Sequence, residues 1–187
     1  MVTLAPFDHL RTALRRHDRA VLEPGASLAA AVLVPLYESR GELGLVFTRR
    51  TLTVASHKGE ISFPGGVIDE IDADVVASAL REAQEEVGLE PDHVDVLGVM
   101  DDRRTVTGFL ITPVVGRIPF PYTFKPSPSE VAEVLTASLA ELCRPGVHRV
   151  EEWQRGGVSH TVHFYDLGRV TIWGATGQLL HDLLTLL

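Results

Sequence analysis

The sequence is poor in the features that mark secreted, membrane-embedded and nucleic-acid-binding proteins. Its 187 residues include one cysteine, Cys143, so no intramolecular disulfide can form, which is typical of a reducing compartment. No uninterrupted apolar run reaches the roughly 18 residues of a membrane-spanning helix. Basic residues number 17 against 25 acidic ones, and this net charge of −8 argues against nucleic acid and anionic membranes as partners. We therefore expect a cytoplasmic protein with a small-molecule partner, and composition leaves its oligomeric state open.

What the sequence does contain suits one globular domain over residues 1–187. Hydrophobic residues make up 45% and charged residues 22%, values that allow a sizeable core beneath a hydrated surface. The continuous apolar run at 27–37 predicts a strand buried on both faces, and 43–50 predicts the strand that returns after a turn. Shorter apolar segments predict further strands over 94–100, 109–116, 147–153, 160–167 and 170–173.

Helical periodicity adds the other half of the predicted architecture. A short basic amphipathic helix is expected over 7–17, a clearer one over 73–87, and a terminal one over 177–187 with Thr176 as its cap. Strands thus occur early, in the middle and late in the chain, with one long helix among them and another at the end. This order predicts an α/β fold in which a mixed β-sheet is sandwiched between helices.

The predicted helix over 73–87 carries a cluster of carboxylates. Its buried stripe is formed by small and aliphatic residues, namely Val76, Ala79, Leu80, Ala83 and Val87. Glu82, Glu85 and Glu86 are spaced i, i+3 and i+4, so they share a flank well away from that stripe. Arg81 lies four residues before Glu85 and can orient a carboxylate by ion pairing.

Two interpretations of this cluster are open on spacing alone. One is a solvated acidic helix face, which is the usual fate of such runs. The other is a set of hard oxygen ligands for Mg²⁺ or Mn²⁺, which could bridge the phosphates of a substrate and activate a water. The Pro-Gly-Gly bend at 64–66 favours the second interpretation, because backbone without side chains can approach a ligand closely.

The stretch "REAQEEVGL" (81–89) is similar to the second half of the Nudix box, whose pattern is G-x5-E-x7-R-E-U-x-E-E-x-G-U. The matching residues are Gly66, Arg81, Glu82, Glu85, Glu86, Gly88 and Leu89. The interval from Gly66 to Arg81 is one residue longer than the pattern, and the first acid falls near Asp72 or Glu70. The same lengthening is a feature of the branch that resembles coenzyme A pyrophosphatases.

A second signature of that branch resembles "LVFTRRTLTVASHKGEISFPGG" (45–66). The matching residues are Thr48, Arg50, Thr51, Gly59, Phe63, Pro64, Gly65 and Gly66. His57 stands where the branch often has histidine, whereas Ala55 replaces an arginine. The chain is therefore identified as a member of the Nudix hydrolases, most similar to the coenzyme A pyrophosphatase branch.

The resemblance implies a Nudix-type α/β/α sandwich that hydrolyses a nucleoside diphosphate linked to another group. By motif position, Glu82 and Glu86 would be the main ligands of Mg²⁺ or Mn²⁺, and the Gly66 carbonyl would complete the shell. Glu85 would bind metal or orient water, and Arg81 would hold the glutamates in place. Glu130 and Glu133 are both candidates for a further downstream acid.

For coenzyme A or an acyl-coenzyme A, the products would be (acyl-)4′-phosphopantetheine and adenosine 3′,5′-bisphosphate. The expected substrate-binding residues are Arg50, Thr51, His57, Lys58 and Phe63. Arg50 is expected to bind the 3′-phosphate in preference to Arg49, although a solvated basic loop fits the pattern equally well. The alternatives are a hydrolase of ADP-ribose or another dinucleotide, and a non-catalytic nucleotide sensor on the same fold.

Two histidines near the C-terminal end invite a different interpretation. His160 and His163 lie three residues apart on a predicted strand, so their side chains point to opposite faces. The sequence therefore argues against a transition-metal site formed by this pair.

Overall fold

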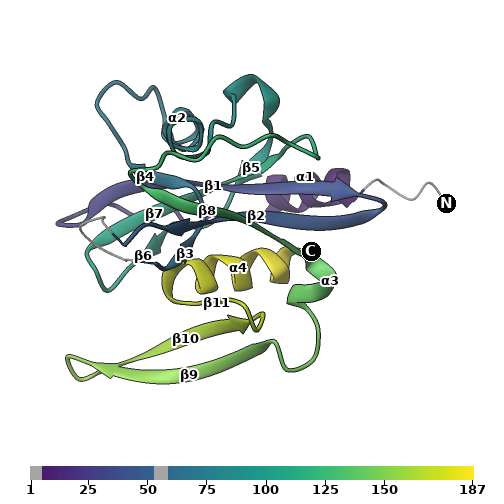
Figure 1. Cartoon of the computed structure of the whole chain (residues 1–187). Coiled ribbons are helices and arrows are strands. Elements are labelled where there is room, and N and C mark those ends of the chain that lie inside the picture. The colour runs from purple at the N-terminus through teal and green to yellow at the C-terminus, as the bar shows by residue number, and fades with distance from the viewer. Residues whose placement is uncertain (1–5, 53–58) are drawn as a thin grey trace.

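The computed structural model describes residues 6–52 and 59–187, and its centre is a mixed β-sheet (Figure 1). The strands of this sheet are β1 (Leu28–Ser39), β2 (Glu42–Arg50), β3 (Ile61–Ser62), β4 (Gly65–Val67), β5 (Asp95–Val99), β6 (Arg103–Arg104), β7 (Phe109–Arg117) and β8 (Val131–Ser138). Their order is β3-β2-β1-β7-β5, with β4 paired to β1, β6 to β7 and β8 to β2. Only β1 and β7 run parallel among these paired strands, so the sheet is mixed, as predicted.

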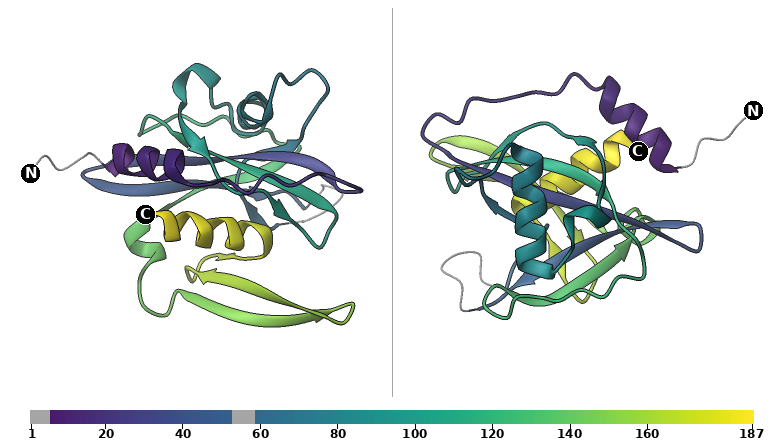
Figure 2. Two further views of the ribbon diagram at one scale, coloured as in Figure 1. Left: turned by 180° about the vertical axis from the view of Figure 1, so that it is seen from behind. Right: turned by 90° about the horizontal axis from the view of Figure 1, so that it is seen from above.

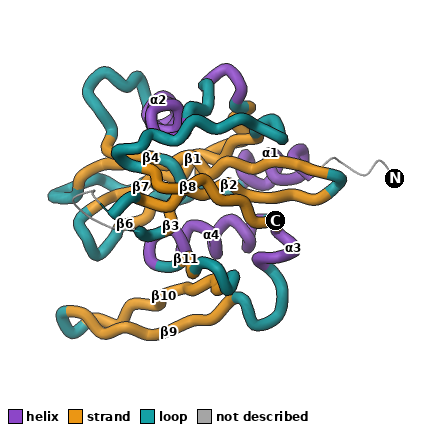
Figure 3. Tube along the Cα trace, viewed as in Figure 1, coloured by secondary structure: helices purple, strands orange, loops and turns teal. Residues whose placement is uncertain are grey.

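Helices cover both faces of this sheet, which explains the apolar run of β1. The helices are α1 (Pro6–Arg16), α2 (Val75–Val87), α3 (Leu139–Leu142), α4 (Gly174–Leu186) and the short 3₁₀ helix η1 (Pro91–His93). Helix α2 packs on one face, where Ala83 joins Leu33 in one hydrophobic cluster. Helices α1 and α4 pack on the other, where Leu10 and Leu180 join Phe47 in a second cluster. Figure 3 shows α2 and α4 on opposite sides of the sheet, which confirms the predicted α/β/α sandwich.

The C-terminal strands differ from the prediction in their partners. Strands β9 (His148–Arg155), β10 (Val158–Asp166) and β11 (Thr171–Ile172) exist where strands were expected, but they form a separate antiparallel sheet. This second sheet lies beyond α4, which therefore lies between the two sheets (Figures 1 and 2). Strand β8 was not predicted, because its alternating burial on the sheet offers no continuous apolar run.

The terminal helix begins earlier than predicted. Helix α4 starts at Gly174 with Trp173 as its N-cap residue, so Thr176 lies inside the first turn and the predicted Thr176 cap is wrong. Helix α4 packs closely against β10 at Gly177, because a Cβ at this position would lie 2.3 Å from the His163 carbonyl oxygen. The close approach fixes α4 against β10. Within the described residues, no helix is long and apolar enough to cross a membrane.

Candidate active site

Helix α2 is delimited by the residues on either side of it. The Asp74 side chain accepts a hydrogen bond from the Ala77 backbone N–H at 2.8 Å, so the helix begins at Val75, two residues later than predicted. Gly88 ends it with a φ of 66°, the left-handed conformation that glycine adopts without strain. These two ends hold the acidic cluster in register against the bend between β3 and β4.

Arg81 organises one half of the cluster through its whole guanidinium group. Its Nε and Nη2 donate to the two carboxylate oxygens of Asp72 at 2.9 and 3.0 Å. Its Nη1 donates to Glu82 at 2.8 Å and to Glu85 at 3.2 Å. The hydrogen-bonded guanidinium holds the pKa of Asp72 well below its usual range, and Asp72 raises the pKa of Arg81. Asp72, with a nearly buried side chain, therefore takes the place of the first acid, whereas Glu70 is exposed.

Glu86 is the buried member of the cluster, with only 2% of its surface exposed. Its Oε2 accepts from the Gly65 backbone N–H at 3.3 Å, and its Oε1 lies 3.4 Å from Arg50 Nη1. Burial raises the pKa of Glu86 to about 7, although the Arg50 charge opposes the rise. The prediction of an acidic flank remote from the packed face is therefore wrong for Glu86, because the Pro-Gly-Gly bend covers that side of α2.

Glu82 faces the backbone of the same bend. A Cβ at Gly66 would lie 2.5 Å from the Glu82 carboxylate, so a glycine is required for this close approach. Burial raises the pKa of Glu82, Arg81 opposes the rise, and the charges of Glu85 and Glu130 add to it. Glu82, Glu86 and the Gly66 backbone thus converge, whereas the side chain of Glu85 is 59% exposed at the rim.

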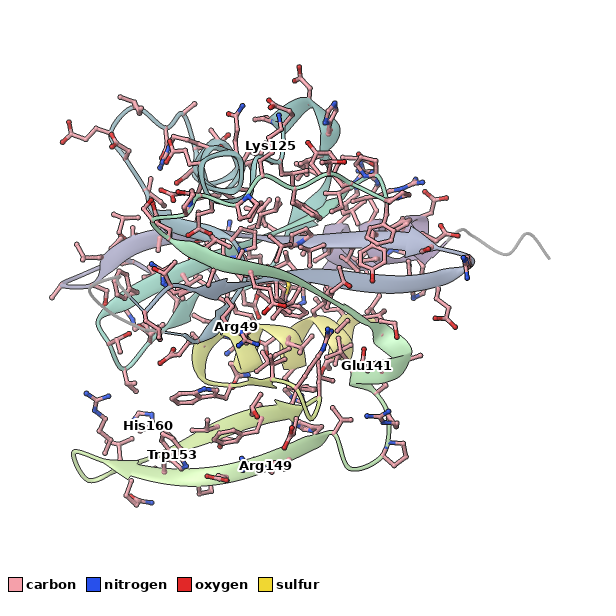
Figure 4. All side chains as sticks on the ribbon, in the orientation of Figure 1. Arg49, Lys125, Glu141, Arg149, Trp153 and His160 are labelled. Carbon is pink, nitrogen blue, oxygen red and sulfur yellow. The ribbon has the colours of Figure 1, made fainter. Side chains whose placement is uncertain are left out.

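The structure separates the two candidates for the downstream acid. The charge of Glu130 raises the pKa of both Glu82 and Glu86, which places Glu130 beside the cluster. Its backbone carbonyl accepts from the Thr51 N–H at 2.8 Å, which joins this loop to the end of β2. Glu133 instead lies 3.5 Å from Arg49, and Figure 4 shows Arg49 on the α4 side of the main sheet. Glu130 is therefore the better candidate.

The remaining predicted residues are distributed unevenly around this site. Arg50 lies within it, 3.4 Å from Glu86, and its expected contact with the 3′-phosphate stays a prediction. The Thr51 hydroxyl donates to the Ser129 carbonyl at 3.0 Å and holds the Glu130 loop. Phe63 is 3% exposed and stacks on Phe47 at 4.8 Å, so it packs in the core and does not face a substrate.

Three further sequence positions fall outside the described residues. They are Ala55, His57 and Lys58. The expected contacts of His57 and Lys58 with substrate therefore stay predictions.

The donor set of the cluster fits a hard divalent cation. The carboxylates of Glu82 and Glu86, which both lie against the glycine bend, are oxygen ligands of the kind that Mg²⁺ and Mn²⁺ accept. Glu86 is buried with one long hydrogen bond and one long ion pair, so its negative charge is only partly compensated by protein. The predicted ligands Glu82, Glu85, Glu86 and Gly66 therefore stay a prediction, with Glu130 as a further candidate from the loop that Thr51 holds.

The mixed sheet between helices defines an α/β/α fold, and its candidate site is an arginine-organised carboxylate cluster against a glycine bend. The chain belongs to the Nudix family: residues 27–159 match the family described as the NUDIX domain. Nudix hydrolases generally use divalent metal ions.

Similar sequences cover most of the chain. A Nudix hydrolase NudL of Cronobacter sakazakii is 44% identical over 154 residues, which cover 82% of this chain and 80% of the relative. A NudL of Shigella flexneri serotype 5b is 37% identical over 180 residues, or 96% of this chain and 90% of the relative. Both are described as uncharacterized, so these relatives support the family without adding a substrate.

Solved structures of low identity share the fold. A MutT/nudix family protein from Enterococcus faecalis has a TM-score of 0.57 and 16% identity, and the match covers 98% of this chain and 69% of that one. An Ap4A hydrolase from C. elegans, in a binary complex, has a TM-score of 0.51 and 15% identity over 61% of this chain and 82% of that one. The predicted family and fold class are confirmed.

Proposed function

We propose that this protein is a diphosphatase that requires Mg²⁺ or Mn²⁺ and hydrolyses coenzyme A or acyl-coenzyme A. The products are (acyl-)4′-phosphopantetheine and adenosine 3′,5′-bisphosphate. The observation that carries the proposed chemistry is the buried Glu86, which lies against Gly65 and Arg50 beside Glu82. The choice of coenzyme A rests on the resemblance of residues 45–66 to the signature of that branch.

The protein groups prepare the site before substrate arrives. Arg81 holds Asp72, Glu82 and Glu85 through four hydrogen bonds, so the carboxylates keep their positions despite their mutual repulsion. Glu82, Glu86, Glu130 and the Gly66 carbonyl would hold the cation. When bound, a divalent cation neutralises charge on the diphosphate and acidifies a bound water.

Two residues are suited to the hydrolytic step itself. The exposed carboxylate of Glu85 lies at the rim of the cluster, where it can orient a water and accept its proton. The water oxygen then bonds to one phosphorus, the bridging P–O bond breaks, and two phosphomonoesters leave. The Arg50 guanidinium, which lies 3.4 Å from Glu86, is placed to offset the charge of the phosphates as they enter.

A hydrolysis screen tests the proposal. Coenzyme A, acyl-coenzyme A, ADP-ribose, NADH and diadenosine polyphosphates are each incubated with the protein and Mg²⁺, Mn²⁺ or a chelator, and the products are identified by mass spectrometry. We expect coenzyme A or its acyl forms to show the highest kcat/KM, with no turnover in chelator. Preference for ADP-ribose or a dinucleotide would support the alternative hydrolase. Saturable nucleotide binding without turnover of any substrate would support the sensor.

We also propose that the whole chain, 1–187, acts as one domain. The second sheet has no separate core that the structure describes, because Tyr165 and Ile172 belong to the same hydrophobic cluster as Leu36 and Phe47 of the main sheet. Trp153 and Trp173 lie at the second sheet, so their fluorescence reports its unfolding. Heat denaturation monitored by this fluorescence should therefore give one transition, at the same temperature as the loss of helical circular dichroism.

A further inference from the structure

Three histidines from three different elements meet on the side of the main sheet away from α2. His148 opens β9 and is exposed, His163 is buried in β10, and His181 is half-buried on α4. One ring nitrogen from each lies within 4.8 Å of the others. Figure 1 shows α4 and the second sheet on one side of the main sheet and α2 on the other, so this cluster is separate from the carboxylate site.

The contacts among these imidazoles are close. His148 Nε2 and His163 Nδ1 share a hydrogen bond at 2.9 Å. The rings of His163 and His181 stack with centroids 3.9 Å apart, and those of His148 and His181 lie 5.5 Å apart. The nearest acid on α4, Asp182, is already bound by Arg103 at 2.8 Å and by Gln178 at 3.0 Å. Three bases therefore share one small volume, and Asp182 is held by other partners.

We propose that His148, His163 and His181 form a second metal site, which binds Zn²⁺ or a similar divalent transition ion. Imidazole nitrogen is a ligand that these ions favour, whereas Mg²⁺ and Ca²⁺ favour oxygen. Three histidines leave the fourth position of a tetrahedral ion for water.

Binding of the ion requires the imidazoles to move, because the rings of His163 and His181 are stacked and one nitrogen from each histidine lies only within 4.8 Å of the others. Zinc–nitrogen bonds of about 2.05 Å at tetrahedral angles put ligand nitrogens about 3.3 Å apart. The 2.9 Å between His148 Nε2 and His163 Nδ1 would have to widen by about 0.4 Å, with the ion replacing the shared proton. His148 is exposed at the end of its strand, so its side chain has room to make this movement. Burial and the neighbouring His181 lower the pKa of His163, which supports a neutral imidazole with a free lone pair.

An ion at this position would tie the β9–β10 hairpin to α4. Only folding brings the three elements together, so an ion that binds all three histidines stabilises the folded state by mass action. Gly177 lies one helical turn before His181 and packs on the His163 carbonyl, so the backbones of α4 and β10 are already in contact there. The expected role is structural, in contrast to the carboxylate cluster on α2.

The test uses the full-length protein after removal of metal with a chelator. Zn²⁺ or Co²⁺ is added in the presence of saturating Mg²⁺, which occupies the carboxylate cluster. We expect one equivalent of zinc to remain after desalting, and Co²⁺ to give the visible absorption of a tetrahedral, nitrogen-ligated ion. At a Zn²⁺ concentration about 100-fold above Kd, the Tm should rise by roughly 5–10 °C.

Matched variants identify the ligands. His148→Asn and His181→Gln should weaken Zn²⁺ binding at least about ten-fold and remove the Tm shift. His160→Asn is the control, because His160 lies on β10, the strand of His163, opposite Trp153 and near the hairpin end in Figure 4, and is not part of the cluster. Glu86→Gln should retain the bound zinc. The proposal is overturned if wild-type protein retains no zinc, if His148→Asn and His160→Asn bind it equally, or if Glu86→Gln abolishes binding.

Discussion

At the scale of single residues, the burial of Glu86 has the largest consequences. Its pKa, raised to about 7 by burial, means that the folded protein without metal holds a proton there through mildly acidic pH. The partial compensation by Arg50 and the Gly65 N–H leaves the ionised form dependent on a cation. The stability, the pH dependence and the metal requirement of the protein should therefore all change when this carboxylate is altered.

We expect Glu82→Gln and Glu86→Gln to lose nearly all hydrolysis while the protein stays folded. Each change removes a charge that would hold the cation and keeps the shape of the side chain. Initial rates at saturating Mg²⁺, together with circular dichroism, provide the measurement. Glu70→Gln is the matched control, because Glu70 is an exposed acid on the loop just before α2. Near-wild-type turnover in either of the two variants would contradict the ligand assignment.

The pH dependence of stability follows from the same residue. The pKa of Glu86 rises from 4.5 to about 7 on folding, so its contribution is fully present below pH 4.5 and is lost as pH rises towards 7. In chelator, the Tm of wild type relative to Glu86→Gln should therefore fall across this window. Saturating Mg²⁺ should reverse the trend, because ionised Glu86 then binds the ion. Parallel Tm profiles of the two proteins in chelator would show that Glu86 does not titrate here.

Arg50→Ala tests whether this arginine binds the 3′-phosphate of the substrate or offsets the charge of the carboxylate cluster. Since Arg50 lies 3.4 Å from Glu86, we expect kcat/KM to fall by a similar factor, about ten-fold or more, for coenzyme A and 3′-dephospho-coenzyme A. Arg50→Lys should recover part of the loss through its charge. A loss confined to coenzyme A would restore the original expectation of a 3′-phosphate contact.

At the scale of elements, the site depends on how closely β4 approaches α2. Gly66 contacts the Glu82 carboxylate so closely that even a methyl group must displace it. The approach is possible because the buried side chains of Ala79 and Ala83 are small and allow α2 to pack closely on the sheet. The geometry of the metal site is thus a property of the strand–helix pair.

We expect Gly66→Ala to raise the Mg²⁺ concentration needed for half-maximal activity with little loss of stability. The added Cβ would lie 2.5 Å from the Glu82 carboxylate and push it out of position. Gly88→Ala is the contrasting change, because a φ of 66° costs a residue with a Cβ roughly 1–2 kcal/mol. It should lower the Tm, and metal affinity should change less than in Gly66→Ala. An unchanged Mg²⁺ requirement in Gly66→Ala would contradict the close approach.

At the scale of the whole molecule, the two proposed metal sites lie on opposite sides of the main sheet. The carboxylate cluster lies on α2, and the three histidines lie between α4 and the second sheet. Mg²⁺ or Mn²⁺ would therefore stabilise the α2 side of the main sheet, and Zn²⁺ would stabilise the side that carries α4 and the second sheet. Their effects on stability should be separable by variants in one site at a time.

We expect Mg²⁺ to raise the Tm of the wild-type protein. Carboxylates that repel one another without metal are neutralised by an ion that binds only the folded state, which adds about 2.7 kcal/mol at 100 times Kd. Scanning calorimetry with Mg²⁺ or chelator provides the measurement, and Glu82→Gln serves as the comparison. Wild-type curves that superimpose in the two conditions would count against a preformed site.

Patterns within short stretches of sequence were enough to predict the local elements and the family. The β1–β2 hairpin, the helix that carries "REAQEEVGL", and the Gly88 terminus depend on local periodicity and glycine conformation, which neighbours in sequence decide. The mixed sheet between helices followed from the order of these elements. The Nudix box placed Arg81 beside its glutamates for the same reason, since residues three and four apart share a helix flank.

Only the tertiary structure decided the environment of those residues. Burial of Glu86 and its contact with Arg50 depend on segments 36 residues apart, so no local pattern predicts them. The same holds for the separate second sheet and for the meeting of His148, His163 and His181, which come from two strands and a helix. Local sequence determines which elements form, because backbone conformation depends on near neighbours. Charge state and ligand geometry depend on which distant elements exclude water together, and that is settled only when the chain packs.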